Sequence, residues 1–316
     1  MNANAEMRMP LLDMAFYLLD SDHSPQDFTL ILHLRNPPSV DRLQAGATSA
    51  INRFPKSGSC IERNKWVWRE DTQFKVSDSP IENFIDEPFD LRQERPVRQA
   101  LISDGTGTRL VTRFHHAAAD GLSAALWLGH QLNVAYGVEA VERERAPFVE
   151  VPLHRLPMSV RRSMFAFDKA SDPLWTSQSE RSGSRRWLTI GFPASDLQKA
   201  CRQAAGFTYN DLLATCTLEL FSQWNSICRG GTPWPPDLSN SGDLRAGRPD
   251  NKRIGLWIPM NIRRESSVGF GNGTSRIRLY ARYKPAAPLV EKAREVRRQV
   301  SWTSNTANGS CLTSPG

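Results

Sequence analysis

The feature that most constrains this chain is a motif in which two adjacent histidines are followed, after three alanines, by aspartate and glycine: His115, His116, Asp120 and Gly121. Residues 109–114, ahead of the motif, alternate in the pattern of a β-strand, and residues 122–128, behind it, have the spacing of an amphipathic helix. The histidines therefore stand where a strand ends and a loop leads into a helix. A neutral imidazole can accept a proton near pH 7, as the activation of an alcohol or amine requires.

Two other interpretations of the motif are open. Two histidines at the end of a strand can simply be packed side chains. His116 and Asp120 are also four residues apart, so they could bind a metal ion from one face of a helix. Most metal sites need three or more ligands, however, and Gly121 would interrupt that helix. The sequence has no other His-x-x-His pair or Cys/His cluster, so we expect no metal.

The composition is that of an ordinary soluble globular protein, with 23% charged and 40% hydrophobic residues. A length of 316 residues predicts one large or two medium domains. No apolar run approaches the roughly 20 residues of a membrane-spanning helix. Residues 1–8 lack the apolar core of a signal peptide, which favours a cytoplasmic location. The five cysteines are widely spaced without a Cys-x-x-Cys pair and predict no disulfide framework.

Positive charge is concentrated in the last third of the chain. Although the net charge is only +7, the segment Arg245–Arg298 contains 14 Lys and Arg against 4 Asp and Glu. Such a surface can bind nucleic acid, anionic lipid or a phosphorylated cofactor, or it can simply be solvated. Because the chain has no nucleic-acid-binding motif and no basic stretch interleaved with aromatic residues, we expect no nucleic-acid partner.

The motif His-His-x-x-x-Asp-Gly resembles the signature of the condensation-domain acyltransferase superfamily. That superfamily includes peptide-synthetase condensation domains, plant acyl-CoA-dependent acyltransferases, polyketide-associated acyltransferases and bacterial wax ester synthase/diacylglycerol acyltransferases. The resemblance implies that the catalytic positions are His115, His116, Asp120 and Gly121. Within this set, His116 would be the general base, Asp120 would hold the structure, and Gly121 would keep a channel beside the histidine open.

Four segments in the same order resemble the wax ester synthase group: 10–13, 88–98, 208–221 and 258–275. By this resemblance, Arg263 forms a salt bridge with Asp120, and Asn272 lines the substrate channel. Asn210 and Asp211 are assigned to the channel as well. A second interpretation of these two residues is favoured, in which they cap the helix that follows them.

The resemblance implies an α/β fold, the two-layer chloramphenicol acetyltransferase-like fold, with two halves in a V around a central channel. We expect an N-terminal half over 1–140, a crossover linker over the proline-containing segment 141–186, and a C-terminal half over 187–303. Residues 304–316 are polar and predict a disordered tail. Since members of the family are longer, we expect the second half to be incomplete.

The predicted activity is transfer of an acyl group from a thioester, acyl-CoA, to an alcohol, with His116 as base. No cofactor is expected to be bound, and the co-substrate would be acyl-CoA or acyl-phosphopantetheine. The partners would be this acyl donor, the alcohol acceptor, and a carrier protein or a completing polypeptide, with at most peripheral contact to a membrane or lipid surface. The alternatives are a carrier-protein-dependent condensation enzyme of natural-product biosynthesis and a catalytically silent, truncated relative that binds a partner.

Overall fold

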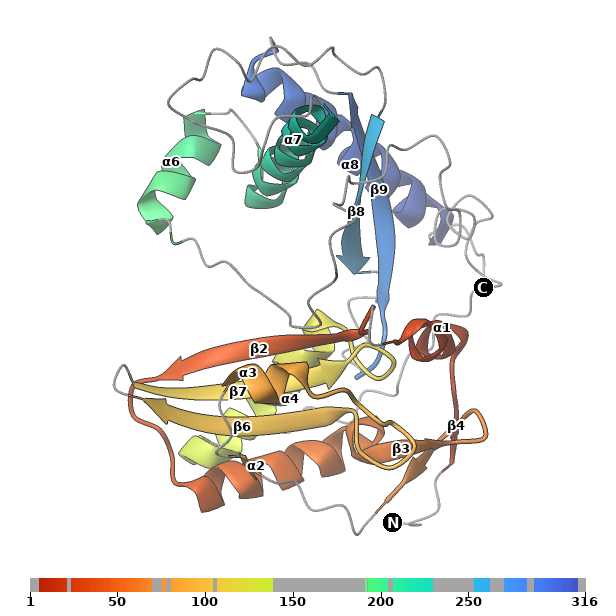
Figure 1. The fold of residues 1–316 in the computed structure, drawn as a ribbon, viewed down its shortest axis with the longest axis vertical. Coiled ribbons are helices and arrows are strands. Elements are labelled where there is room, and N and C mark those ends of the chain that lie inside the picture. Colours follow the sequence, from red (N-terminus) through yellow and green to blue (C-terminus); the bar gives the residue numbers. More distant parts are fainter. Residues whose placement is uncertain are drawn as a thin grey trace. The chain divides into compact units, whose positions relative to one another are not determined.

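The computed structural model describes residues 6–21, 24–69, 76–77, 81–104, 107–138, 191, 193–203, 207–229, 253–261, 270–282 and 287–311 (Figure 1). The chain forms two compact units. The first contains the N-terminal residues through Val151 and also the later segment Ile262–Thr274. The second contains most of the remainder, including Leu188–Asn261 and Ser275–Gly316.

The first unit is built on a four-stranded sheet in the order β2-β7-β6-β5. The strands are β2 (Asp27–Leu34), β7 (Gly107–His115), β6 (Val97–Asp104) and β5 (Val76–Ser77). β2 and β6 pair antiparallel with β7, and β5 pairs parallel with β6. The predicted strand at 109–114 is therefore confirmed as part of β7, which places the histidine motif at the end of a central strand.

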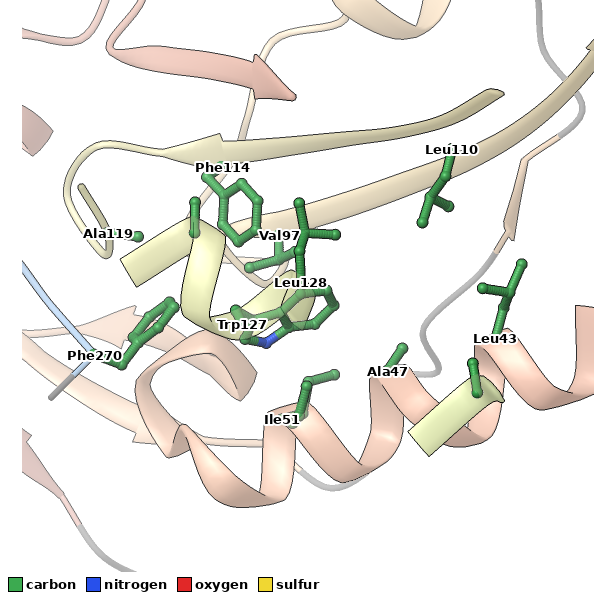
Figure 2. Packing of buried hydrophobic residues seen from close by; sticks show 13 residues of the cluster. Leu43, Ala47, Ile51, Val97, Leu110, Phe114, Ala119, Trp127, Leu128 and Phe270 are labelled. Atoms are coloured by element: carbon green, nitrogen blue, oxygen red, sulfur yellow. The ribbon is translucent and has the colours of Figure 1, made fainter. Parts of the chain in front are cut away.

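Two helices, α2 (Val40–Arg53) and α4 (Gly121–Tyr136), pack against each other and cover one face of this sheet (Figure 2). Trp127 of α4 is fully buried and contacts the ring of Phe114 at a centroid distance of 5.7 Å. The helices approach closely at Gly46, where a Cβ atom would lie 2.4 Å from the carbonyl oxygen of Gln131. Alternate residues of a strand point to opposite faces, so the same strands also present apolar side chains on the other face of the sheet. The short helix α3 (Ile81–Asp86) packs there.

Capping residues define both ends of helix α4. The side chain of Asp120 accepts a hydrogen bond from the backbone N–H of Ser123, which satisfies one of the unpaired groups of the first turn. Gly137 ends the helix in the left-handed conformation, with a φ of 70° that favours glycine. The predicted helix at 122–128 is thus confirmed, and its start is fixed by a residue of the motif.

A second, smaller sheet in the first unit has the order β1-β4-β3, with strands β1 (Met7–Arg8), β4 (Lys65–Trp68) and β3 (Ser59–Glu62). Helix α1 (Leu11–Leu19) follows β1, and the short 3₁₀ helix η1 (Pro55–Gly58) precedes β3. The apolar cluster beneath this sheet includes Met9, Trp66 and the two alanines that follow His116 in the motif, Ala117 and Ala118.

The second unit contains the two-stranded sheet of β8 (Arg253–Asn261) and β9 (Thr274–Arg282) with helices α6 (Ala194–Gln203), α7 (Tyr209–Arg229) and α8 (Leu289–Cys311). Leu218 of α7, Leu279 of β9 and Val296 of α8 are buried together in its core. In the described part of the chain, no helix combines the length and the apolar character needed to cross a membrane.

The organisation differs from the sequence prediction in two places. The predicted halves were contiguous, whereas residues from Ile262 to Thr274 belong to the first unit, because the described residues 270–273 are buried against it. The tail predicted to be disordered from residue 304 is helical as far as Cys311. Extending a helix that has already formed requires far less free energy than starting one, so a polar sequence can continue it. The predicted linker at 141–186 lies outside the described residues.

Candidate active site

His116 occupies the first turn position after β7, at the edge of the main sheet. Its backbone N–H donates to the carbonyl oxygen of Gln26 at 2.7 Å. Its half-buried ring lies between two aromatic rings, stacked on Phe16 of α1 at 5.0 Å and tilted against Phe28 of β2 at 4.5 Å between centroids. Nδ1 is buried and has no well-formed hydrogen bond among the described residues. These ring contacts hold the imidazole in place without using its nitrogen atoms, so they do not prevent the ring from accepting a proton.

The surroundings of His116 favour the neutral ring. Burial lowers the pKa of His116 below its ordinary value of 6.5, because the charged form loses hydration. The neighbouring His115 lowers the pKa further, while the backbone of Ala119 and the carboxylates of Asp120 and Asp27 oppose the shift without reversing it. His116 is therefore unprotonated at pH 7, which is the state that a general base needs.

His115 has a different environment from that of its neighbour. Its ring is buried, and its Nδ1 accepts a hydrogen bond from the backbone N–H of Ala117 at 3.0 Å. A neutral ring with Nδ1 as acceptor carries its proton on Nε2, which lies 3.2 Å from a carboxylate oxygen of Asp20. This geometry indicates that His115 stabilises the turn in which His116 lies.

Asp120 joins α4 to Gly273, which lies 153 residues further along the chain. One carboxylate oxygen caps α4, and the other accepts a hydrogen bond from the backbone N–H of Gly273 at 2.9 Å. Ser123 strengthens the same junction, because its hydroxyl donates to the carbonyl oxygen of Gly271 and accepts from the N–H of Gly271. Arg263, the predicted partner of Asp120, lies outside the described residues, so that salt bridge stays a prediction.

Gly121 is the first residue of α4 and is exposed. A Cβ atom added there would meet nothing within 4 Å, so the fold itself does not require glycine at this position. The predicted role of Gly121, leaving space beside the histidine for a substrate, is compatible with this geometry and stays a prediction.

Asn272 contacts the histidine turn directly. Its side-chain amide donates to the backbone carbonyl oxygen of His116 at 2.6 Å and to a carboxylate oxygen of Asp13 at 2.9 Å. Asp13 is fully buried, and its other oxygen accepts from the indole N–H of Trp66 and forms an ion pair with the buried Lys56. The sequence predicts that Asn272 lines the channel, whereas its contacts here are those of a residue that positions the turn.

A buried ion pair joins β7, the strand that ends just before His116, to its neighbour β2. The guanidinium of Arg113 in β7 donates from Nε and Nη2 to one carboxylate oxygen of Asp27 in β2, at 3.0 and 2.5 Å. Its Nη1 donates to the carbonyl oxygens of Phe84 and Glu87, both at 2.6 Å. Charge-assisted bonds of this kind are stronger than neutral ones, and they hold the end of β7 against β2.

The other two predicted channel residues lie in the second unit, at the start of α7. Asp211 is buried and accepts hydrogen bonds from the backbone N–H and the hydroxyl of Thr208, while the Thr208 hydroxyl accepts from the N–H of Asp211. This reciprocal pattern caps the helix. Asp211 also pairs with Arg297 of α8 at 3.3 Å, and Asn210 is exposed. These contacts support the capping interpretation for Asp211, with Thr208 as the capping residue.

The sequence analysis assigned no role to several residues that surround the motif in space although they lie far from it in the sequence. Asp13, Asp27, Phe16, Phe28 and Lys56 all come from the first 56 residues. One signal was present, because a charged residue in a short apolar helix, such as Asp13 in α1, must find a partner when the helix is buried. The identity of that partner depends on the fold and could not be read from the pattern.

No family model and no curated protein matches the chain. Similarity is found to solved structures. The first condensation domain of the CDA synthetase has a TM-score of 0.66 and 13% identity, covering 97% of this chain and 76% of that one. The epimerization domain from the third module of tyrocidine synthetase B has a TM-score of 0.61 and 13% identity, covering 95% and 73%. Polyketide synthase associated protein 5 from Mycobacterium tuberculosis has a TM-score of 0.58 and 16% identity, covering 96% and 75%. The chain has the condensation-domain fold.

The predicted α/β fold class is therefore confirmed, and the condensation-domain fold is shared by proteins of several kinds. One similar structure is a complex of the X-domain and OxyB from teicoplanin biosynthesis, with a TM-score of 0.55 and 14% identity, covering 94% of this chain and 70% of that one. A fold shared by such different proteins does not define an activity, which must be argued from the site.

Proposed function

We propose that this chain is an acyltransferase in which His116 acts as general base, moving an acyl or aminoacyl group from a thioester to an acceptor. The observation that carries the proposal is the neutral, half-buried imidazole of His116 at the end of a central strand. His116 would take the proton of the acceptor hydroxyl or amine as that oxygen or nitrogen attacks the thioester carbonyl carbon. The carbon–sulfur bond then breaks, and the imidazolium returns the proton to the departing thiolate. Neither a metal ion nor an acyl-enzyme is needed for this sequence.

The donor we propose is a thioester carried on the phosphopantetheine arm of a carrier protein. Two of the similar structures named above are domains of peptide synthetases, and a third is a polyketide synthase associated protein, which supports this donor over free acyl-CoA. The wax ester synthase-like segments of the sequence support acyl-CoA and a lipid alcohol as the second candidate. Both donors present the same thioester to His116.

The donor can be identified by offering one acyl group in two forms, as a CoA thioester and as a thioester on a phosphopantetheinylated carrier protein. The purified full chain is mixed with each donor and with an alcohol or an amine acceptor, and products are quantified by mass spectrometry. We expect faster transfer from the carrier protein. Faster transfer from acyl-CoA would favour the second candidate. If neither donor yields product, the enzymatic proposal fails, and stable co-elution with the carrier protein would then favour a purely binding role such as that suggested by the X-domain complex.

The rate of transfer should fall only at acidic pH. Because burial holds the pKa of His116 below 6.5, the base is already unprotonated at pH 7, and raising the pH further cannot activate it. Lowering the pH protonates the ring and removes the base, so the acid limb of the pH–rate profile should lie below pH 6.5. Turnover measured between pH 5 and 8 tests this expectation, using a donor whose thioester is stable over that range. A limb centred above pH 6.5 would contradict it.

A further inference from the structure

Asp20, the residue at which α1 ends, contacts two residues that adjoin His116, one in space and one in the sequence. One of its carboxylate oxygens, Oδ1, accepts a hydrogen bond from the backbone N–H of Gln26 at 2.7 Å. The other oxygen, Oδ2, lies 3.2 Å from Nε2 of His115. The side chain of Asp20 is 25% exposed, whereas the ring of His115 is buried. The reaction proposed above assigns no role to this carboxylate.

The contacts of His115 define which of its ring nitrogens carries the proton. Nδ1 accepts from the backbone N–H of Ala117 at 3.0 Å, so in a neutral ring the proton is on Nε2. That N–H group lies beside the carboxylate of Asp20, which can only accept when it is ionised. The two atoms are close but are not aligned as in a full hydrogen bond, so their attraction is mainly electrostatic. Asp20 and the N–H of Ala117 therefore favour the same tautomer.

The backbone on both sides of His116 is connected to Asp20. The N–H of His116 donates to the carbonyl oxygen of Gln26 at 2.7 Å, and the N–H of the same Gln26 donates to Asp20. In the turn that follows, the N–H of Ala117 donates to the ring of His115. The Nε2 atom of that ring is the one beside Asp20. A change in Asp20 would therefore reach His116 by two routes.

From these contacts we infer that Asp20 is a positioning residue for the acyl transfer. It holds His115 with the proton on Nε2 and thereby stabilises the turn that carries the base, His116. The effect on the rate rests on the proposed function, whereas the effect on the tautomer of His115 does not. The same carboxylate also ties the end of α1 to Gln26, and Phe16 of this helix stacks on the ring of His116 at 5.0 Å.

The variant Asp20→Asn separates the two contacts of this side chain. Asparagine has nearly the shape of aspartate, but it has one acceptor and one donor group in place of two acceptors. Its oxygen can keep the hydrogen bond with the N–H of Gln26, and its NH₂ group then faces Nε2 of His115. Because two donors would oppose each other, the ring should carry its proton on Nδ1 instead. A proton on Nδ1 excludes the hydrogen bond from Ala117, so the turn loses that support.

The tautomer can be measured by NMR on the full chain with isotope-labelled nitrogen in its histidine rings, at about pH 8, where a free imidazole is neutral. Correlations between ring protons and ring nitrogens show which nitrogen carries the proton, and the signals of His115 are those absent from His115→Gln. We expect the proton on Nε2 in the parent and a shift toward Nδ1 in Asp20→Asn. A parent with the proton on Nδ1, or an Asp20→Asn variant with an unchanged tautomer, would overturn the inference. This measurement needs no turnover, so it gives a result even if the acyltransferase proposal fails.

Kinetics test whether the tautomer of His115 matters for the reaction. Asp20→Asn should lower kcat at least about 10-fold with little change in the KM for the donor, because a displaced base misses the geometry of proton transfer while substrate binding is unaltered. In the His115→Gln background, which has no ring to orient, Asp20→Asn should have little further effect on kcat. An equal loss in both backgrounds, or a shifted tautomer with an unchanged kcat, would show that Asp20 does not position the base through His115.

Asp41→Asn is the matched control. Asp41 is an exposed aspartate in the first turn of α2, and replacing it removes the same charge. This variant should leave both the tautomer of His115 and kcat unchanged. Thermal unfolding of every variant checks that the fold is intact, and the tautomer of the parent tests the inference even if Asp20→Asn does not fold. If Asp41→Asn lowers kcat as much as Asp20→Asn does, the loss comes from surface charge and the role of Asp20 is wrongly assigned.

Discussion

Replacing His116 by glutamine should lower the rate of acyl transfer at least about 100-fold, the lower range for loss of a general base. Glutamine keeps much of the volume between Phe16 and Phe28 and can still form hydrogen bonds, but it cannot accept the proton of the acceptor. The backbone contacts of this position to Gln26 and Asn272 do not involve the side chain, so the turn should keep its shape. Turnover is measured at saturating donor, and thermal unfolding is measured alongside it.

His130 provides a matched control for this experiment. It is a second histidine whose pKa is lowered by burial, and its Nε2 lies 3.0 Å from the hydroxyl of Ser49 on α2. His130→Gln should therefore have a similar effect on packing and charge but leave turnover unchanged. A His116→Gln variant that keeps most of the parent's turnover would show that another group, or none, acts as the base.

The local structure around the motif could be predicted because it depends on residues that are neighbours in the sequence. Alternation up to Phe114 predicts the strand and the spacing of residues 122–128 predicts the helix, and both appear as β7 and α4, while the capping of α4 by Asp120 is seen only in the structure. The orientation of the two histidines then follows, since adjacent residues at a strand end face different environments. His115 is buried against Phe89 and Asp20, while His116 lies between Phe16 and Phe28.

The contacts that hold this motif could not be predicted, because they join residues far apart in the sequence. Asn272 reaches the carbonyl oxygen of His116 across 156 residues, and Asp13 reaches Asn272 across 259. Periodicity describes one element at a time and carries no information on which buried carboxylate meets which amide. The same limit applies to Asp13, whose place in a short apolar helix signals that it needs a partner but not that its partners are Asn272, Trp66 and Lys56.

Replacing Asp13 by alanine should lower the free energy of unfolding of the first unit by roughly 3–5 kcal/mol, the cost of leaving one charge of a buried pair uncompensated. Asp13 is 0% exposed and Lys56 is 5% exposed, so the stranded ammonium group would be poorly hydrated. The variant also leaves the indole N–H of Trp66 and the amide of Asn272 without their acceptor. Urea denaturation followed by tryptophan fluorescence measures the change.

The exposed ion pair between Lys65 and Glu6, with 50% and 54% of the two side chains exposed, is the matched control. Lys65→Met should cost only about 0–1 kcal/mol, because water hydrates the remaining charge. In the double variant Asp13→Ala/Lys56→Met neither charge of this pair is left buried, so the loss of stability should be clearly smaller than the sum of the two single losses. Additive losses would show that Asp13 and Lys56 do not depend on each other. If Asp13→Ala costs no more than Lys65→Met, then the buried network does not hold the turn of His116 in place, and the positioning role assigned to Asn272 through Asp13 fails with it.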